Sequence, residues 1–193
     1  MNTPAHVVVN LLVLGRERPR ESVAPIALGA LLPDLPMFFF YVVERVALGQ
    51  SEGVIWGERY FDVGWQAFFD LFNSLPLIFV LGAAGWMLGS RSVRLLALSM
   101  ALHVAFDLPF HHDDGHRHFF PFSMWRYASP LSYWDPAHHG LILAPAEALL
   151  VLFGSAVLWR RHPSRRGRLW VGGVAAIYVA YLAFGLARWA GSA

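Results

Sequence analysis

The stretch SVRLLALSMALHVAFDLPF, residues 92–110, bears most directly on the fold. A transmembrane helix needs about 20 mostly apolar residues to cross the roughly 30 Å hydrocarbon core of a bilayer. This stretch is long and apolar enough to cross, yet it contains His103 and Asp107. Ionisable side chains inside a membrane segment are costly unless they are paired, and they usually mark a functional site.

Several other segments are similarly apolar. They are residues 66–89, 138–159 and 169–187, and a further run at 22–48 that Pro33-Asp34-Leu35-Pro36 interrupts. The opening run 4–15 reaches only about 18 Å at helical rise, which is too short to cross alone. We therefore predict an all-α, polytopic membrane helix bundle with about five to six membrane segments and a broken second helix. We expect residues 1–193 to form a single integral membrane domain.

The composition agrees with a membrane protein and narrows the chemistry. Hydrophobic residues make up 56% of the chain, and charged residues make up 15%, against roughly 25% in soluble domains. Because the chain has no cysteine, any tightly bound metal must be held by His, Asp and Glu. All the cationic side chains are arginines, scattered among apolar runs instead of forming one stripe, which argues against a nucleic-acid partner.

The arginines also predict the orientation of the chain in the membrane. Clusters at 16–20, 91–94 and 160–168 fall on one side when six segments alternate in direction. The positive-inside rule makes that side cytoplasmic. The histidine-rich loop at 111–137 then faces outward. We expect a protein of the inner (cell) membrane with its His-rich loop outside and its Arg-rich loops in the cytoplasm.

His103 and Asp107 are four residues apart, so a helix places them on one face and one turn apart, close enough to share a metal ion. A second polar feature is the break at 33–36. Pro33 and Pro36 remove two backbone donors, and broken backbone at membrane depth is tolerated where it is buried or lines a polar cavity. Asp34 is therefore either presented to such a cavity or caps the half-helix that follows.

Helical rise gives the depth of each polar residue below the outer surface. His103 comes out at about 10 Å, Glu147 at about 13 Å and Asn73 near His103. Asp34 comes out at about 12 Å and His6 somewhat deeper. Five polar residues from five segments thus fall in nearly one layer of the outer half of the membrane.

The order of motifs resembles a known family. An N-terminal His6 is followed by GALLPDLP (29–36), NSLPL (73–77), HVAFDLPFHHDDGHRHFFPFS (103–123) and SYWDPAHHG (132–140). This order resembles the membrane-bound metal-dependent hydrolase family, bacterial integral membrane proteins that are similar to zinc-dependent phospholipase C in the order of their ligands. The resemblance covers most of the chain up to about residue 150.

By position, the resemblance implies a set of metal ligands, namely His6, Asp34, His103 and Asp107. One of the four histidines His111, His112, His116 and His118 would join them, with His112 and His118 favoured. His139 is a further candidate ligand. The chain departs from the family where Asn73 replaces a histidine, and where His139 and Glu147 are eight residues apart, about 12 Å along a helix. We therefore expect one or two bound ions.

Simpler interpretations exist for part of the loop. Asp113-Asp114-Gly115 is ordinary turn sequence. His138 and His139, at a helix start, are either ligands or interfacial residues. Asp135, before Pro136, is more typical of a helix N-cap than of a ligand.

The expected function is that of a metal-dependent hydrolase that cleaves an ester or phosphodiester of a lipid-derived substrate at the outer leaflet. Nitrogen and oxygen ligands suit Zn²⁺, with Mn²⁺ or Fe²⁺ as alternatives. Zinc lowers the pKa of a water and polarises a carbonyl or phosphoryl oxygen. The candidate catalytic groups are Glu147 and Asp107, and the candidate substrate contacts are Arg117, Arg126 and Asn73.

Two other classes use buried polar groups in the same way. One is an ion- or proton-coupled membrane transporter, and the other is a structural membrane subunit with a metal-stabilised fold. A transport pathway needs polar groups that continue into the cytoplasmic half. Asn10 and Ser99 are nearly all that the sequence offers there, which favours a closed site.

Overall fold

A computed structural model describes residues 1–15, 19–133, 135–161 and 164–190. Arg16 and Arg18 of the first arginine cluster lie outside these ranges. Within them the chain is helical and contains no strand.

The α-helices are α1 (Thr3–Leu14), α2 (Pro19–Leu31), α3 (Leu35–Tyr41), α4 (Glu52–Gly57), α5 (Val63–Phe72), α6 (Leu75–Met87), α7 (Arg91–Asp107), α8 (Gly140–Arg161) and α9 (Arg165–Ala190). A π-helical turn, η1 (Val42–Ala47), continues α3. The short 3₁₀ segments are η2 (Arg59–Phe61), η3 (Leu108–Phe110) and η4 (Pro136–His138).

Four segments of the described chain are long and apolar enough to cross a membrane: Val63–Met87, Arg91–Phe110, Gly140–Arg161 and Arg165–Phe184. A fifth results if the bent pair Glu21–Leu31 and Leu35–Ala47 counts as one span. The helix α1 has 12 residues and is too short to cross alone. The prediction of an all-α membrane bundle with a broken second segment is confirmed.

The break in the second segment follows from its prolines. Between α2 and α3 the chain makes a turn in which the Asp34 amide donates to the Leu31 carbonyl at 3.1 Å. The helix axis bends there by 52°. Because the backbone cannot continue as one helix through Pro33 and Pro36, Asp34 lies in a buried turn between α2 and α3 instead of within one continuous helix.

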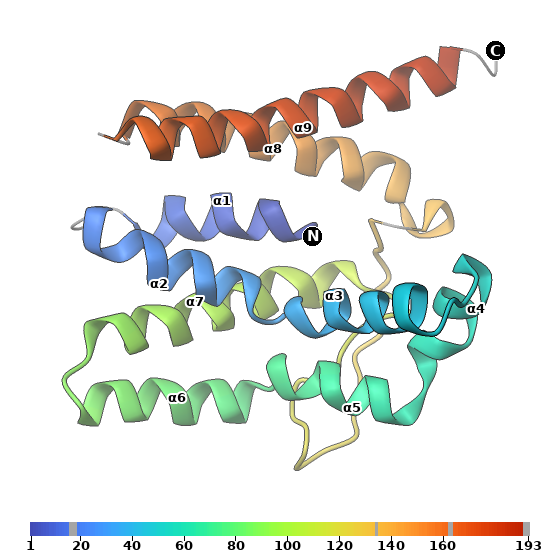
Figure 1. Ribbon diagram of the computed structural model, residues 1–193, viewed down its shortest axis with the longest axis horizontal. Helices are drawn as coiled ribbons and strands as arrows, with labels where there is room; N and C mark the ends of the chain where they lie inside the picture. The colour runs from blue at the N-terminus through green and yellow to red at the C-terminus, as the bar shows by residue number, and fades with distance from the viewer. Residues whose placement is uncertain (16–18, 134, 162–163, 191–193) are drawn as a thin grey trace.

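The short helix α1 occupies the centre of the bundle. It lies between the α8–α9 pair and the layer formed by α2, α7 and α6 (Figure 1), and it packs against α2, α7 and α8. Most of its side chains are buried, including His6 and Asn10. A helix that is buried all round provides a site shielded from both lipid and water.

Close packing of α2 on α7 depends on Gly29. A Cβ atom at this position would overlap the Leu96 carbonyl oxygen of α7 and would lie 2.7 Å from the Ser99 Cβ. Small residues allow membrane helices to approach in this way. The approach places the Ala30 carbonyl of α2 against His103 of α7.

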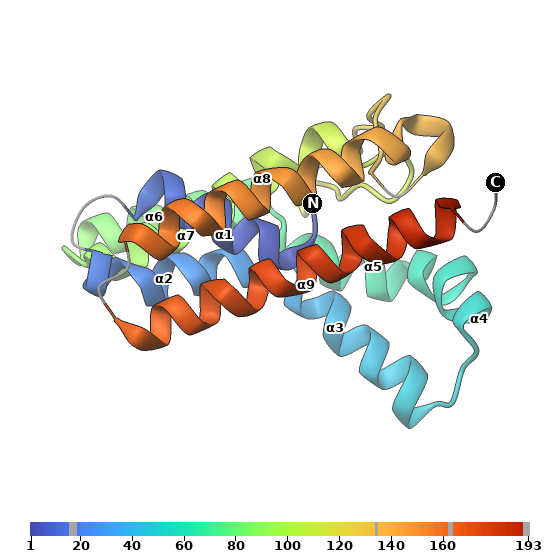
Figure 2. The same cartoon turned by 90° about the horizontal axis from the view of Figure 1, so that it is seen from above.

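The polar ends of the bundle are separated. The end of α6, the start of α7, the end of α8 and the start of α9 all lie at one end, whereas the loop between η3 and η4 lies at the other (Figure 1). At that second end, α3 diverges from the line of α2 and leads towards α4 (Figure 2). Apolar side chains on the outside, such as Phe79 and Phe153, are exposed as expected for contact with lipid.

Candidate metal centre

Three ionisable side chains meet where α1 crosses α7. His6 comes from α1, and His103 and Asp107 come from α7, one turn apart. A ligand atom of each lies within 4.8 Å of the others, and all three residues are buried. The two imidazole rings stack with their centroids 3.6 Å apart. Within the described part of the chain, this His6–His103–Asp107 group is the one whose spacing can hold a metal ion.

Asp107 faces both histidines of the group. Its Oδ1 lies 2.9 Å from His6 Nε2, and its Oδ2 lies 3.0 Å from His103 Nε2. The Met1 amine lies 2.5 Å from Oδ1. Asp34 Oδ1 lies 3.4 Å from His103 Nε2, so a second carboxylate borders the group. Two carboxylates and two imidazoles inside an apolar bundle require positive charge, either on the imidazoles and the amine or on a bound cation.

Neighbouring groups orient these side chains. The Ala30 carbonyl lies 2.8 Å from His103 Nδ1, and because a carbonyl only accepts, Nδ1 carries a proton and Nε2 is left facing the carboxylates. Thr3 Oγ1 donates to Asp34 Oδ2 at 2.6 Å. Such outer contacts accompany most metal-ligating histidines and carboxylates. His6 Nδ1 and His103 Nε2 are buried ring nitrogens without a hydrogen bond, so the donor set fits a metal ion.

The turn at 33–36 presents Asp34 to the group. Asp34 directly precedes α3, but its side chain makes no capping hydrogen bond, so the capping interpretation is wrong. Asn73, the residue after α5, lies behind this turn. Its Nδ2 donates to the carbonyl oxygens of Pro33 and Phe69, at 3.1 Å in each case. Asn73 therefore holds the turn in place instead of pointing into the group.

The loop histidine that approaches the group is His111. Its Nε2 lies 3.6 Å from Asp107 Oδ1, and its Nδ1 lies 2.8 Å from Asp114 Oδ2. Burial alone would lower the pKa of His111, but the neighbouring carboxylates of Asp107 and Asp114 raise it to about 9. The sequence predicts His112 and His118 at this place instead. The overlooked signal is spacing, because His103, Asp107 and His111 follow each other at intervals of four.

His112 and His139 do not join the group. His112 Nδ1 lies 2.6 Å from the Ser129 carbonyl, and its ring stacks on that of His138 at 3.7 Å. His138 in turn contacts Asp135, whose other oxygen caps the 3₁₀ turn at Ala137. His139 is exposed and has a left-handed backbone with φ of 69°. The N-cap interpretation of Asp135 is confirmed.

The other polar side chains proposed for the site have partners elsewhere. His118 is buried with its Nδ1 at 3.2 Å from the Asn73 carbonyl, and burial lowers its pKa to about 4. Arg117 donates to the buried Asp70 through both its backbone and its guanidinium. Arg126 donates to Gln66 Oε1 at 2.6 Å. These contacts fasten the loop 111–126 to α5.

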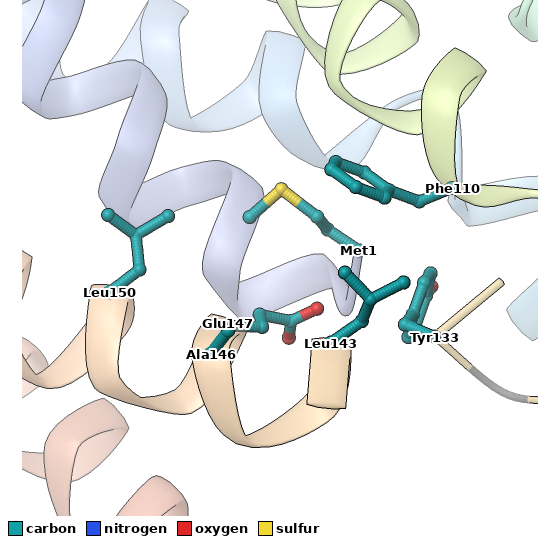
Figure 3. Close-up of a pocket in the computed structure, with 7 residues that line it drawn as sticks. All are labelled: Met1, Phe110, Tyr133, Leu143, Ala146, Glu147 and Leu150. Atoms are coloured by element: carbon teal, nitrogen blue, oxygen red, sulfur yellow. The ribbon is translucent and has the colours of Figure 1, made fainter. Parts of the chain in front are cut away.

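Glu147 lies on α8, beside the start of α1. Its carboxylate accepts from the Asn2 backbone at 3.2 Å, from Asn2 Nδ2 at 2.9 Å and from the Tyr178 hydroxyl at 2.8 Å. The preceding residue, Met1, contacts Asp107. Glu147 is therefore separated from the His6–His103–Asp107 group by the N-terminal residues and lines a pocket next to it (Figure 3).

Polar contacts deeper in the bundle link helices to one another. Asn10 Nδ2 donates to both the carbonyl and the hydroxyl of Ser99, each at 2.8 Å. The Ser99 hydroxyl donates to the Ile26 carbonyl at 2.6 Å. This set joins α1, α7 and α2 with short hydrogen bonds, as polar residues do between packed membrane helices.

No protein-family model, curated protein or solved structure matches this chain. Inferences about its function therefore rest on the geometry and chemistry of its own residues.

Proposed function

We propose that this protein is a metal-dependent hydrolase that cleaves an ester or phosphodiester of a lipid-derived substrate at the outer leaflet of the inner membrane. The observation that carries the proposal is the buried His6–His103–Asp107 group, in which Asp107 lies 2.9 Å from His6 Nε2 and 3.0 Å from His103 Nε2 inside an apolar bundle. Paired or metal-bound ionisable groups at membrane depth usually serve function. The order of the sequence motifs, which resembles that of membrane-bound metal-dependent hydrolases, is in keeping with this proposal.

In this proposal His6, His103 and Asp107 hold the ion, and Asp34 completes the ligand set. Zinc suits nitrogen and oxygen donors without sulfur, with Mn²⁺ or Fe²⁺ as alternatives. When bound, the ion supplies a Lewis acid that activates water and polarises the scissile carbonyl or phosphoryl group. The contact between the Ala30 carbonyl and His103 keeps the imidazole in the tautomer that ligation needs.

Glu147 is the proposed general base. It is buried, it lines the pocket beside the group, and its carboxylate is held by Asn2 and Tyr178. A carboxylate fixed in this way can accept a proton from water in the pocket that it lines, and general-base catalysis contributes about 10²–10⁴-fold. Arg117 and Arg126 are assigned to holding the loop through Asp70 and Gln66, and not to substrate contact.

The orientation is part of the proposal. The described arginines Arg91, Arg94, Arg160 and Arg161 belong to the ends of α6–α9 that gather on one side of the bundle (Figure 1). The positive-inside rule assigns that side to the cytoplasm. The His-rich loop and the proposed site then lie toward the outer leaflet.

The test is hydrolysis of membrane lipids by the purified full chain. Protein reconstituted with zinc into vesicles of bacterial phospholipids should release a lipid product, detected by mass spectrometry, and a chelator should stop the release. Glu147→Gln should lower the rate about 10²-fold or more while zinc still binds. Absence of a zinc-dependent product from a broad lipid mixture, or equal release by Asp107→Asn, would contradict the proposal.

A further inference from the structure

A pocket of about 160 Å³ opens beside the metal centre (Figure 3). Its walls are largely apolar and come from η3 and α8: Phe110, Leu143, Ala146 and Leu150. The Met1 side chain covers one side, and the wall includes the side-chain carboxylate of Glu147.

One end of this pocket faces lipid. Ala146 and Leu150 line the pocket and are also exposed on the surface of α8. Their neighbours Ile142 and Leu149 are 68% and 62% exposed. Since α8 is long and apolar enough to span the membrane, exposed apolar side chains on it contact acyl chains. A chain from the bilayer can therefore enter without crossing water.

The other end of the pocket abuts the metal centre through three connections. Met1 lines the pocket, and its amine lies 2.5 Å from Asp107 Oδ1. Tyr133 also lines it, and its ring lies edge-on to that of His111 at 5.4 Å. Phe110 follows Asp107 by only three residues along α7 and η3. A ligand that fills the pocket thus ends next to the proposed metal ligands.

The size of the pocket suits part of a chain. An apolar cavity of about 150 Å³ is known to take up benzene, a molecule of six carbons. Pockets that enclose a whole drug-sized ligand run from about 300 to 1,000 Å³. A volume of 160 Å³ therefore matches a stretch of about six carbons, with the remainder of the chain outside in the bilayer.

The charged groups beside the pocket favour an acyl chain with an uncharged ester over one with a free carboxylate. Glu147 lies in the wall, and Asp107 and Asp34 lie beyond it. A free fatty acid would add a fourth carboxylate to these three, where the Met1 amine is already paired with Asp107, and like charges in an apolar setting repel strongly. An esterified chain ends in an uncharged carbonyl, which keeps the anionic phosphodiester of the lipid farther from these carboxylates than the carboxylate of a fatty acid would be.

From these contacts we infer that the pocket binds the first carbons of one esterified acyl chain of a membrane lipid, with the head-group end of that chain directed at the metal centre. The inference rests on the proposed function for what then happens to the lipid, because the bound chain places its ester or phosphodiester beside the His6–His103–Asp107 group. Binding itself requires neither metal nor turnover.

The test is photolabelling of the full chain in vesicles of phosphatidylethanolamine and phosphatidylglycerol. The vesicles contain a trace of phospholipid with a diazirine near the ester end of one acyl chain. Labelled positions are mapped by mass spectrometry after irradiation in the presence of a chelator. Labels on Leu143, Ala146 and Leu150 should exceed those on Ile142 and Leu149 by about tenfold, equivalent to ~1.4 kcal/mol. A diazirine fatty acid should not produce this pattern.

Two matched variants sharpen the result. Ala146→Trp fills the pocket and should remove the labels from Leu143 and Leu150. Ala156→Trp makes the same change at an exposed position of α8 outside the pocket and should keep them. Even labelling of pocket and exposed residues in the wild type would overturn the inference, as would unchanged pocket labels in Ala146→Trp or an equal pattern from the fatty acid. If the pocket is labelled but no lipid is hydrolysed, the hydrolase proposal fails and the binding site stands.

Discussion

Replacing Thr3 with valine removes one hydroxyl from the edge of the proposed metal centre and preserves the shape of the side chain. Thr3 Oγ1 donates a 2.6 Å hydrogen bond to Asp34 Oδ2, and the other oxygen of that carboxylate faces His103. A hydrogen bond to a charged group contributes about 1.5–3 kcal/mol. Loss of a contact that orients a metal ligand typically weakens metal binding about 10–100-fold. We expect Thr3→Val to weaken zinc binding by such a factor, equivalent to ~1.4–2.7 kcal/mol.

The affinity can be measured by titrating detergent-purified protein with zinc in competition with a chromogenic chelator. Thr3→Ser is the matched control, because it keeps the hydroxyl and should bind zinc like the wild type. In the absence of metal, Thr3→Ser should melt near the wild-type temperature, whereas Thr3→Val should melt several degrees lower because it loses the hydrogen bond to Asp34. Zinc binding by Thr3→Val within about twofold of the wild type would refute the role given to Asp34.

Three further predictions concern stability. Gly29→Ala should lower the unfolding free energy by about 1–3 kcal/mol, because its Cβ would overlap the backbone of α7, whereas Gly173→Ala on α9 has open space and should be neutral. The pKa of His118 is about 4 in the fold against 6.5 when unfolded. Because the unfolded chain takes up this proton more readily, the free energy of unfolding is highest above pH 6.5 and decreases as the pH falls toward 4. We expect a loss of about 2 kcal/mol between pH 8 and pH 5, and a flatter profile in His118→Asn. Asp70→Asn leaves Arg117 without its buried partner and should cost about 3–5 kcal/mol.

Thermal melting in detergent measures all three effects. A Gly29→Ala protein as stable as the wild type would contradict the close approach of α2 to α7. An unchanged pH profile in His118→Asn would show that another group causes the acid sensitivity. A neutral Asp70→Asn change would mean that the loop is held by contacts other than the ion pair with Arg117.

The membrane bundle and half of the candidate site follow from sequence patterns. Long apolar runs predict the spans, and the prolines at 33 and 36 predict the break, because both depend on local chemistry. The four-residue interval between His103 and Asp107 places them on one helix face, and the structure has them there. The depths calculated from helical rise then place His6 and Asp34 near the level of His103 in the membrane.

Depth in the membrane does not predict which neighbours the side chains of Asn73 and Glu147 contact. Both lie near the group, but Asn73 faces the Pro33 carbonyl and Glu147 faces Asn2 and Tyr178. Helical rise gives the position of a residue along the membrane normal, but not which neighbour its side chain faces. That direction depends on how α5 and α8 pack in three dimensions.

The positions of the loop histidines depend on contacts that are distant in sequence. The motif order predicts His112 and His118, whereas His111 is the loop histidine near Asp107, because the 3₁₀ turn at 108–110 continues the helical face of α7 by one turn. The directions of His112 and His118 depend on carbonyl groups of Ser129 and Asn73, which are distant in sequence. Contacts of this kind have no local sequence signal.

The most direct test of the metal centre is elemental analysis of the detergent-purified full chain beside the His103→Ala, Asp107→Ala double variant. We expect the wild type to retain stoichiometric zinc, manganese or iron, and the double variant to lose it while remaining folded by circular dichroism. A wild type without stoichiometric metal after growth and purification in zinc-supplemented medium, or equal metal content in the double variant, would contradict the account.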